Sequence, residues 1–112
     1  MVMTQPVVTT ILPTFRRPRL LGRAIESVIG QTFPEFQLNV YDNASSDDTE
    51  HIVADYAARD PRVKYHRHAS NIGLAKNLAF GLDRVTTPYF SVLSDDDWLL
   101  PGFYRASIGS TA

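Results

Sequence analysis

Three consecutive aspartates, Asp95, Asp96 and Asp97, follow the apolar run 89–93 and precede Trp98. Adjacent like charges repel one another, so this row of carboxylates calls for a compensating cation. Mg²⁺ and Mn²⁺ prefer hard oxygen ligands, and one or two carboxylates often hold them together with substrate phosphates. The row therefore suits a metal–diphosphate site, while a solvated loop or the acidic N-terminus of a helix stays open as the alternative. We expect Trp98 to pack in the core or in the wall of the site.

A second group of polar and aromatic residues follows two other predicted strands. Asp42 and Asn43 end one of them, where a carboxylate or an amide could pair with the edge of a nucleobase. Phe15, after the first strand, could stack on a base or fill the core. Arg16 and Arg17 are interpreted as a solvated loop pair, with phosphate binding as their alternative role.

The remaining chemistry-bearing residues exclude several classes of site. His66 and His68 would face the same side of a strand, but no third metal ligand accompanies them, so an exposed edge strand is the preferred interpretation. The chain has no cysteine, which excludes disulfides and thiolate metal sites. Neither G-x-G-x-x-G nor G-x-x-x-x-G-K-[ST] is present, which argues against dinucleotide-binding and P-loop sites.

The elements that must position these residues alternate along the chain. β-branched and apolar runs predict strands, and apolar residues at helical spacing predict the helices between them. The strands are expected at 7–12, ending at Pro13, and at 36–41, 63–66 and 88–93, the last of them buried. Helices are expected from Arg19 to near Gly30, from about Asp47 to Pro61, and from Asn71 with Leu74, Ala75, Leu78, Ala79 and Leu82 on one face.

This alternation predicts a three-layer, Rossmann-like α/β fold with a parallel sheet in the order 3-2-1-4. In such sheets ligands bind beyond the carboxyl ends of the strands, where the polar groups described above come together. The chain has 112 residues, so it is treated as one domain, 1–112.

Composition narrows the partners and the compartment. The net charge is −1, which gives no field to attract nucleic acid or an anionic membrane. No apolar run approaches the roughly 18 residues of a membrane span, and the N-terminus lacks the pattern of a signal peptide. The absence of cysteine fits a reducing compartment. We therefore expect a cytoplasmic location.

Several motifs in order resemble family 2 glycosyltransferases, which have the GT-A fold. They are "VVTTILPTFRRP", the helix ending in "SVIGQT", "VYDNASSDDT", "NIGLAKNLAFGL" and "YFSVLSDDDWLLP", and they cover the chain from about Val7 to Phe103. The resemblance implies a nucleoside-diphosphate sugar as donor and Mn²⁺ or Mg²⁺ as cofactor. Family domains are about twice as long, so the chain resembles their N-terminal, donor-binding half, cut short.

The resemblance also implies roles for individual residues. By position, Pro13, Thr14 and Phe15 would line the base pocket, and Asp42 and Asn43 would face the base. Asp95 would face the ribose. Asp96 and Asp97 would bind the metal and the diphosphate. Many members have a second Asp where this chain has Asn43; an amide can still accept from a pyrimidine N3–H or suit another base. Where members often have A-R-N, this chain has Asn77, Leu78 and Ala79, and Lys76 is the nearest cation.

The expected function is donor binding for glycosyl transfer to a glycan or lipid acceptor. The parent protein would be an enzyme, while these 112 residues alone are expected to be inactive, because the half with the acceptor site and general base is missing. A lipid acceptor would place the protein at the inner face of the membrane, and an uncovered sheet edge favours a homo-oligomer. A non-catalytic nucleotide-sugar-binding module and a nucleotidyltransferase are the alternatives; the latter lacks its glycine-rich loop here.

Overall fold

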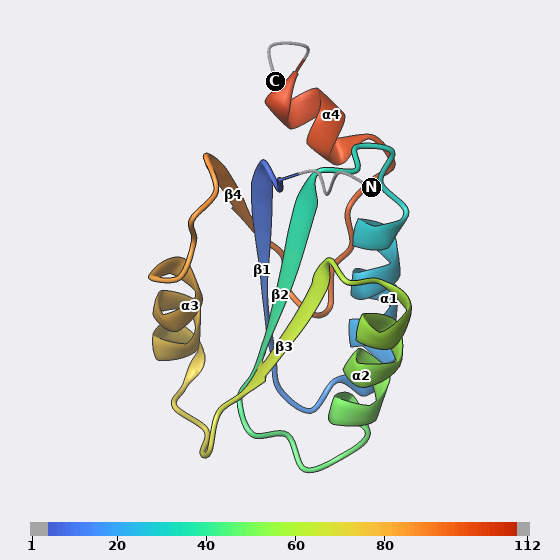
Figure 1. Ribbon diagram of the computed structural model, residues 1–112. Coiled ribbons are helices and arrows are strands. Elements are labelled where there is room, and N and C mark those ends of the chain that lie inside the picture. Colours follow the sequence, from blue (N-terminus) through green and yellow to red (C-terminus); the bar gives the residue numbers. More distant parts are fainter. Residues whose placement is uncertain (1–4, 110–112) are drawn as a thin grey trace.

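Four parallel strands form one sheet in the order β3-β2-β1-β4, as the alternation of elements predicted. The computed structural model describes residues 5–109. The strands are β1 (Val8–Thr14), β2 (Phe36–Asp42), β3 (Val63–Arg67) and β4 (Tyr89–Val92). All of them run in the same direction, so their carboxyl ends lie along one edge of the sheet (Figure 1).

Helices cover both faces of this sheet and give the expected three layers (Figure 1). They are α1 (Pro18–Ile29), α2 (Thr49–Arg59), α3 (Leu74–Leu82) and α4 (Phe103–Ile108). The helices α1 and α2 lie on one face, α3 lies on the other, and α4 lies near the end of the sheet where β1 and β2 begin. Within residues 5–109, every helix is too short or too polar to cross a bilayer.

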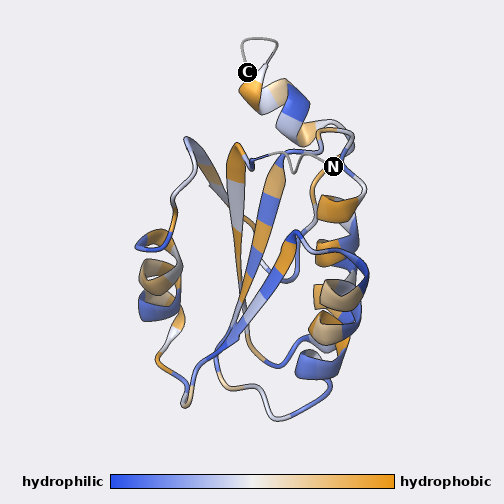
Figure 2. Cartoon of the chain, in the orientation of Figure 1, coloured by the Kyte–Doolittle hydropathy of each residue, from blue (hydrophilic) through white to orange (hydrophobic). Residues whose placement is uncertain are grey.

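The two faces of the sheet differ in polarity. Apolar and polar residues alternate along β2 (Figure 2). Its apolar residues share a core with the buried stripe of α1, which consists of Leu21, Ala24, Ile25 and Val28. Each large aliphatic side chain in this layer contributes about 1.5–3 kcal/mol by leaving water. The layer between the sheet and α1 is therefore the main source of stability.

The layer under α3 is thin and hydrogen-bonded, which differs from the prediction. The helix begins at Leu74 rather than Asn71, and its buried residues are Asn77 and Gly81 rather than the predicted apolar face. Leu74 is 70% exposed. A Cβ added to Gly81 would lie 2.8 Å from the nearest side-chain atoms of the sheet, so only glycine allows this close approach. Of the predicted apolar face, Leu74, Ala75, Ala79 and Leu82 are exposed, while Phe80 stacks on His66 of β3.

The boundaries near the site also differ from the prediction. The strand β1 does not stop at Pro13 but continues to Thr14, paired with β2. Pro13 has no backbone N–H, but this interrupts no hydrogen bonding between strands. The backbone of Pro13 faces β4, and the pairing of β4 with β1 ends at Ile11. The strand β4 is shorter than expected and lies at the edge; Phe90, for example, is 57% exposed, so the expectation of a buried strand was wrong.

Candidate functional site

A cavity of about 490 Å³ opens at the carboxyl ends of β1 and β4. One wall comes from residues that the sequence singled out: Pro13, Thr14, Phe15, Asn43 and Asp95 all line it. The strand order explains this meeting, because β1 lies between β2 and β4 and all three end at the same edge. The sheet thus brings together three polar groups that are distant in the sequence.

The opposite wall was not predicted. It consists of the segment before α3 and the first turns of that helix: Asn71, Gly73, Leu74, Asn77 and Leu78. These residues reach the cavity because α3 packs close to β1 and β2 through Gly81. The N-x-G pattern was visible in the sequence, but the close approach depends on a tertiary contact that helical periodicity does not report.

Asp95 is the most firmly held acidic residue of the site. It is 7% exposed, and its Oδ2 accepts hydrogen bonds from Thr14 Oγ1 at 3.0 Å and from the backbone N–H of Phe15 at 3.3 Å. Its Oδ1 lies 3.5 Å from Arg17 Nη1. The end of β1 therefore fixes this carboxylate at the rim of the cavity.

Asp96 is exposed and forms an ion pair with Arg17. Arg17 Nη1 lies 3.0 Å from Asp96 Oδ2, and Ser94 Oγ donates to Asp96 Oδ1 at 2.6 Å. The hydrogen bond from Ser94, followed by the Arg17 guanidinium, lowers the pKa of the Asp96 carboxyl below its usual value. Arg16 and Arg17 are both exposed, as the sequence suggested, but Arg17 is also the cation that faces the aspartate row.

The end of the aspartate row forms an exposed turn. Asp97 Oδ1 accepts from the backbone N–H of Trp98 at 2.9 Å, and the Asp97 N–H donates to Ser94 O at 3.1 Å. Trp98 is 48% exposed, with the Arg23 guanidinium 4.2 Å from its ring centre. The expectation that Trp98 packs in the core or in the wall of the site was wrong, because the turn directs its ring outward onto α1.

Asp42 is turned into the protein rather than into the cavity. It is fully buried; its Oδ1 accepts from Ser45 N–H at 3.0 Å, and its Oδ2 accepts from the Tyr65 hydroxyl at 2.6 Å. Burial, together with the Asp42 carboxylate, raises the pKa of the Tyr65 phenol, which therefore remains a donor. In this structure Asp42 shapes the turn after β2, and Asn43 alone of the pair lines the cavity.

Lys76 and the two histidines lie outside the cavity lining. Lys76 is an exposed residue of α3. His66 is exposed on β3, as expected, but His68 is buried, and its Nε2 lies 2.7 Å from Asn77 Oδ1. His68 therefore belongs to the contact between the sheet and α3.

The donor set suits a cation that shares its ligands with a substrate. Within residues 5–109, no three His, Cys, Asp or Glu side chains are grouped so that they could hold a metal ion by themselves. The carboxylates of Asp96 and Asp97 are hard, exposed oxygen donors that directly follow Asp95 of the cavity lining. Mg²⁺ and Mn²⁺ are commonly held in this way, by one or two carboxylates with phosphates and water completing the shell. The residues present fit such a cation.

Solved structures share this fold. TarS of S. aureus, residues 1–349 in complex with UDP-GlcNAc, superposes with a TM-score of 0.83 at 24% identity, over 95% of this chain and 30% of that chain. A mannosyltransferase from Pyrobaculum calidifontis, in complex with GDP-Man and Mn²⁺, gives a TM-score of 0.76 at 24% identity, over 84% of this chain and 28% of that chain. Both therefore confirm the expected GT-A architecture.

Curated relatives and a family model agree with the fold. A β-1,3-glucosyltransferase of Campylobacter jejuni, named for GalNAc(5)-diNAcBac-PP-undecaprenol, is 38% identical over 87% of this chain, which spans 32% of that protein. Chondroitin synthase of Escherichia coli is 32% identical over 86% of this chain, which spans 14% of that protein. The model of glycosyl transferase family 2 matches residues 9–108. The chain therefore belongs to glycosyl transferase family 2.

Proposed function

We propose that this chain binds a nucleoside-diphosphate sugar in the cavity at the carboxyl ends of β1 and β4, as the donor-binding part of a glycosyltransferase. One observation carries the proposal: the buried carboxylate of Asp95 is fixed at the cavity rim, with Phe15 and Asn43 in the same lining. The aromatic ring of Phe15 would stack on the base, and the amide of Asn43 would pair with the edge of the base. The carboxylate of Asp95 would accept hydrogen bonds from the ribose.

The diphosphate would lie next to Asp96 and Asp97. A bound Mn²⁺ or Mg²⁺ would neutralise the diphosphate and stabilise it as a leaving group. The Mn²⁺ in the Pyrobaculum mannosyltransferase complex supports a divalent cation in a protein of this fold. The bound nucleotides of the neighbours include both GDP-Man and UDP-GlcNAc, so they support a nucleotide sugar as a class.

Transfer to an acceptor would require more than this site. A general base must lie within hydrogen-bond reach of the acceptor hydroxyl. Exposed carboxylates outside the site, such as those of Glu26, Glu50, Asp55 and Asp83, lie on or next to helices and outside the cavity lining. We therefore infer that the 112 residues bind the donor without transferring the sugar, and that a longer parent is the enzyme.

The acceptor and the assembly are proposed on narrower grounds. The Campylobacter relative has undecaprenol in its name, which supports a lipid-linked acceptor and a location in the cytoplasm at the inner face of the membrane; a glycan is the alternative acceptor.

The edge strand β4 is apolar and exposed at Tyr89, Phe90 and Val92, which favours self-association. Sedimentation at several concentrations would test the oligomer, and a constant monomer mass would exclude it.

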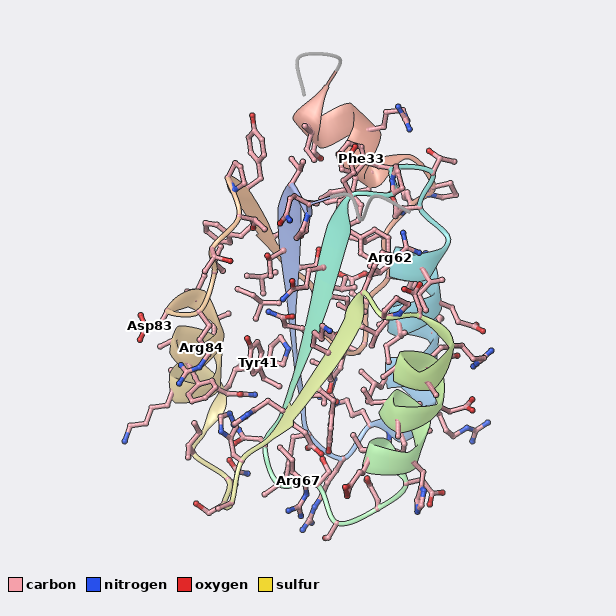
Figure 3. All side chains as sticks on the ribbon, in the orientation of Figure 1. Phe33, Tyr41, Arg62, Arg67, Asp83 and Arg84 are labelled. Atoms are coloured by element: carbon pink, nitrogen blue, oxygen red, sulfur yellow. The ribbon has the colours of Figure 1, made fainter. Side chains whose placement is uncertain are left out.

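Calorimetry on the 112-residue chain tests donor binding. Uridine, thymidine and guanosine diphosphates are titrated with and without Mn²⁺, and at least one is expected to bind more tightly with the metal. Asp96→Ala should remove most of this metal enhancement. Asp83→Ala, which removes an exposed carboxylate on the outer side of α3 (Figure 3), should leave it unchanged. A folded sample that binds none of these nucleotides would contradict the proposed function.

A further inference from the structure

The carboxamide of Asn43 has a fixed orientation. The backbone N–H of Ile72 donates to Asn43 Oδ1 at 2.8 Å. An N–H group can only donate, so the side-chain atom that faces Ile72 must be the oxygen. The amide nitrogen, Nδ2, therefore lies on the opposite branch of the side chain, and its two hydrogens are the groups left for another partner.

That nitrogen reaches the cavity. Among residues 5–109, Asn43 Nδ2 has no hydrogen-bond acceptor. Every side-chain nitrogen or oxygen in this part of the chain that is sealed from solvent has a partner, so Nδ2 must be accessible. Asn43 is 4% exposed, and the space that it borders is the cavity. The small exposed part of this residue is thus a hydrogen-bond donor that borders the cavity.

A segment that we name the strap, residues 68–77, keeps Ile72 in place. Its first residue, His68, donates its backbone N–H to Asp42 O at 2.9 Å. At its other end, Asn77 Nδ2 donates to Tyr41 O at 2.9 Å. Tyr41 projects from β2 toward α3 (Figure 3). Both ends of the strap are therefore bonded to the end of β2, directly beside Asn43.

A side-chain bond joins the two ends of the strap. His68 Nε2 lies 2.7 Å from Asn77 Oδ1, and both residues are buried. Because Asn77 Nδ2 donates to Tyr41 O, its Oδ1 must accept, so His68 carries its hydrogen on Nε2. These bonds fix the backbone that presents Ile72 N–H, and Asn43 cannot turn its amide over without leaving that N–H unpaired.

We propose that Asn43 determines base specificity as a hydrogen-bond donor, with the strap holding it in that polarity. This inference rests on the proposed function, since it requires a nucleotide in the cavity. It differs from the expectation that the Asn43 amide accepts from a pyrimidine N3–H. The recognised group on the base is instead an acceptor, either a carbonyl oxygen or an unprotonated ring nitrogen.

Asn43→Asp separates the two polarities. One carboxylate oxygen can still accept from Ile72 N–H, while the other now presents an acceptor to the cavity, so a donor is replaced by an acceptor. Uracil and cytosine carry opposite groups at ring positions 3 and 4, and guanine and adenine do so at positions 1 and 6. A contact at these positions must therefore change its preference within a pair when residue 43 changes polarity.

The experiment titrates the 112-residue chain, with Mn²⁺ present, with the diphosphates of uridine, cytidine, guanosine and adenosine. For the pair that binds, Asn43→Asp should shift the ratio of the two Kd values by about tenfold or more, away from the wild-type preference. A contact to pyrimidine O2, which both pyrimidines share, would instead weaken both by a similar factor. Gln5→Glu makes the same change from amide to carboxylate at an exposed site outside the cavity lining and should do neither.

Unchanged affinities and an unchanged ratio in Asn43→Asp would overturn the inference. That result is expected if Asn43 already accepts a hydrogen bond from the base, because the aspartate would accept it equally well. That result leaves the proposed function intact, whereas a wild-type chain that binds none of the four nucleotides refutes both. Should Asn43→Asp not fold, NMR of the wild type decides. The Asn43 side-chain amide proton resonances should move downfield on nucleotide binding, and resonances that do not move would contradict a donor role.

Discussion

Two glycines on opposite faces of the sheet should respond in opposite ways to the same substitution. Gly81 of α3 faces Ile11 and Tyr41, and an added Cβ would lie 2.8 Å from a side-chain atom of each. Gly22 of α1 faces only the hydroxyl of Tyr56, 3.7 Å from an added Cβ. Carbon atoms normally pack at about 3.5–4.0 Å, so Gly81→Ala must push α3 away from the sheet and Gly22→Ala need not move α1.

The expected magnitudes follow from these distances. Gly22→Ala should stabilise by about 0.5–1 kcal/mol, since alanine favours the helix and restricts the unfolded chain. Gly81→Ala has the same gain near the end of its helix but adds an overpacking cost of about 1–3 kcal/mol. The net effect at Gly81 should be a destabilisation of up to about 2.5 kcal/mol, and because the helix gain is the same at both sites, the two variants should differ by the overpacking cost of roughly 1–3 kcal/mol.

Urea unfolding followed by circular dichroism measures this difference. With a slope of about 1.5 kcal/mol/M, the two midpoints should lie about 0.7–2 M apart, on either side of the wild type. Displacement of α3 should also weaken nucleotide binding in Gly81→Ala alone, because Asn77 and Leu78 of that helix line the cavity. If Gly81→Ala proves as stable as Gly22→Ala, then α3 does not approach the sheet as closely as the structure indicates.

Two further predictions concern charge. Arg17→Gln removes the cation paired with Asp96, so Mn²⁺ alone should bind about two- to fivefold more tightly by calorimetry, a small effect because the ion pair is exposed. The exposed Arg19→Gln is the control, and equal affinities in both variants would exclude competition by Arg17. Burial raises the pKa of Tyr104 to about 12, so its contribution to stability is complete below pH 10 and is lost as the pH rises toward 12, by up to about 2–3 kcal/mol. Urea unfolding at several pH values should show that Tyr104→Phe removes this loss and that Tyr89→Phe, at an exposed site, does not; identical slopes in the two variants would contradict it.

The order of the strands and the location of the site could be predicted because both follow from local patterns. Strands alternate with helices, right-handed crossovers restrict the topology, and polar residues such as Asp95 and Asn43 directly follow strands. The pairing of Arg17 with Asp96 could have been found by the same reasoning. The order 3-2-1-4 places β4 beside β1, so a cation after β1 is the natural partner of carboxylates after β4.

The direction of a side chain at a strand end could not be predicted from the sequence. Asp42 and Asn43 are neighbours of similar size, yet Asp42 is bonded inside the turn and Asn43 lines the cavity. The difference depends on the Tyr65 hydroxyl and on Ile72 N–H, which come from two later segments of the chain. No local pattern in the sequence contains these partners.

The misreading of α3 has a physical cause that bears on the site. Periodicity assigns the apolar stripe of a helix to the core, and this holds for α1, whose partner layer is apolar. The other face of the sheet presents mainly polar and aromatic groups. The helix α3 is held there by the close approach of Gly81, by the ring of Phe80 and by the bonds of Asn77 to Tyr41 and His68. Apolar packing tolerates small shifts, whereas hydrogen bonds weaken steeply with angle. A wall built from directional bonds can therefore fix the orientation of Asn43 more tightly than an apolar layer could.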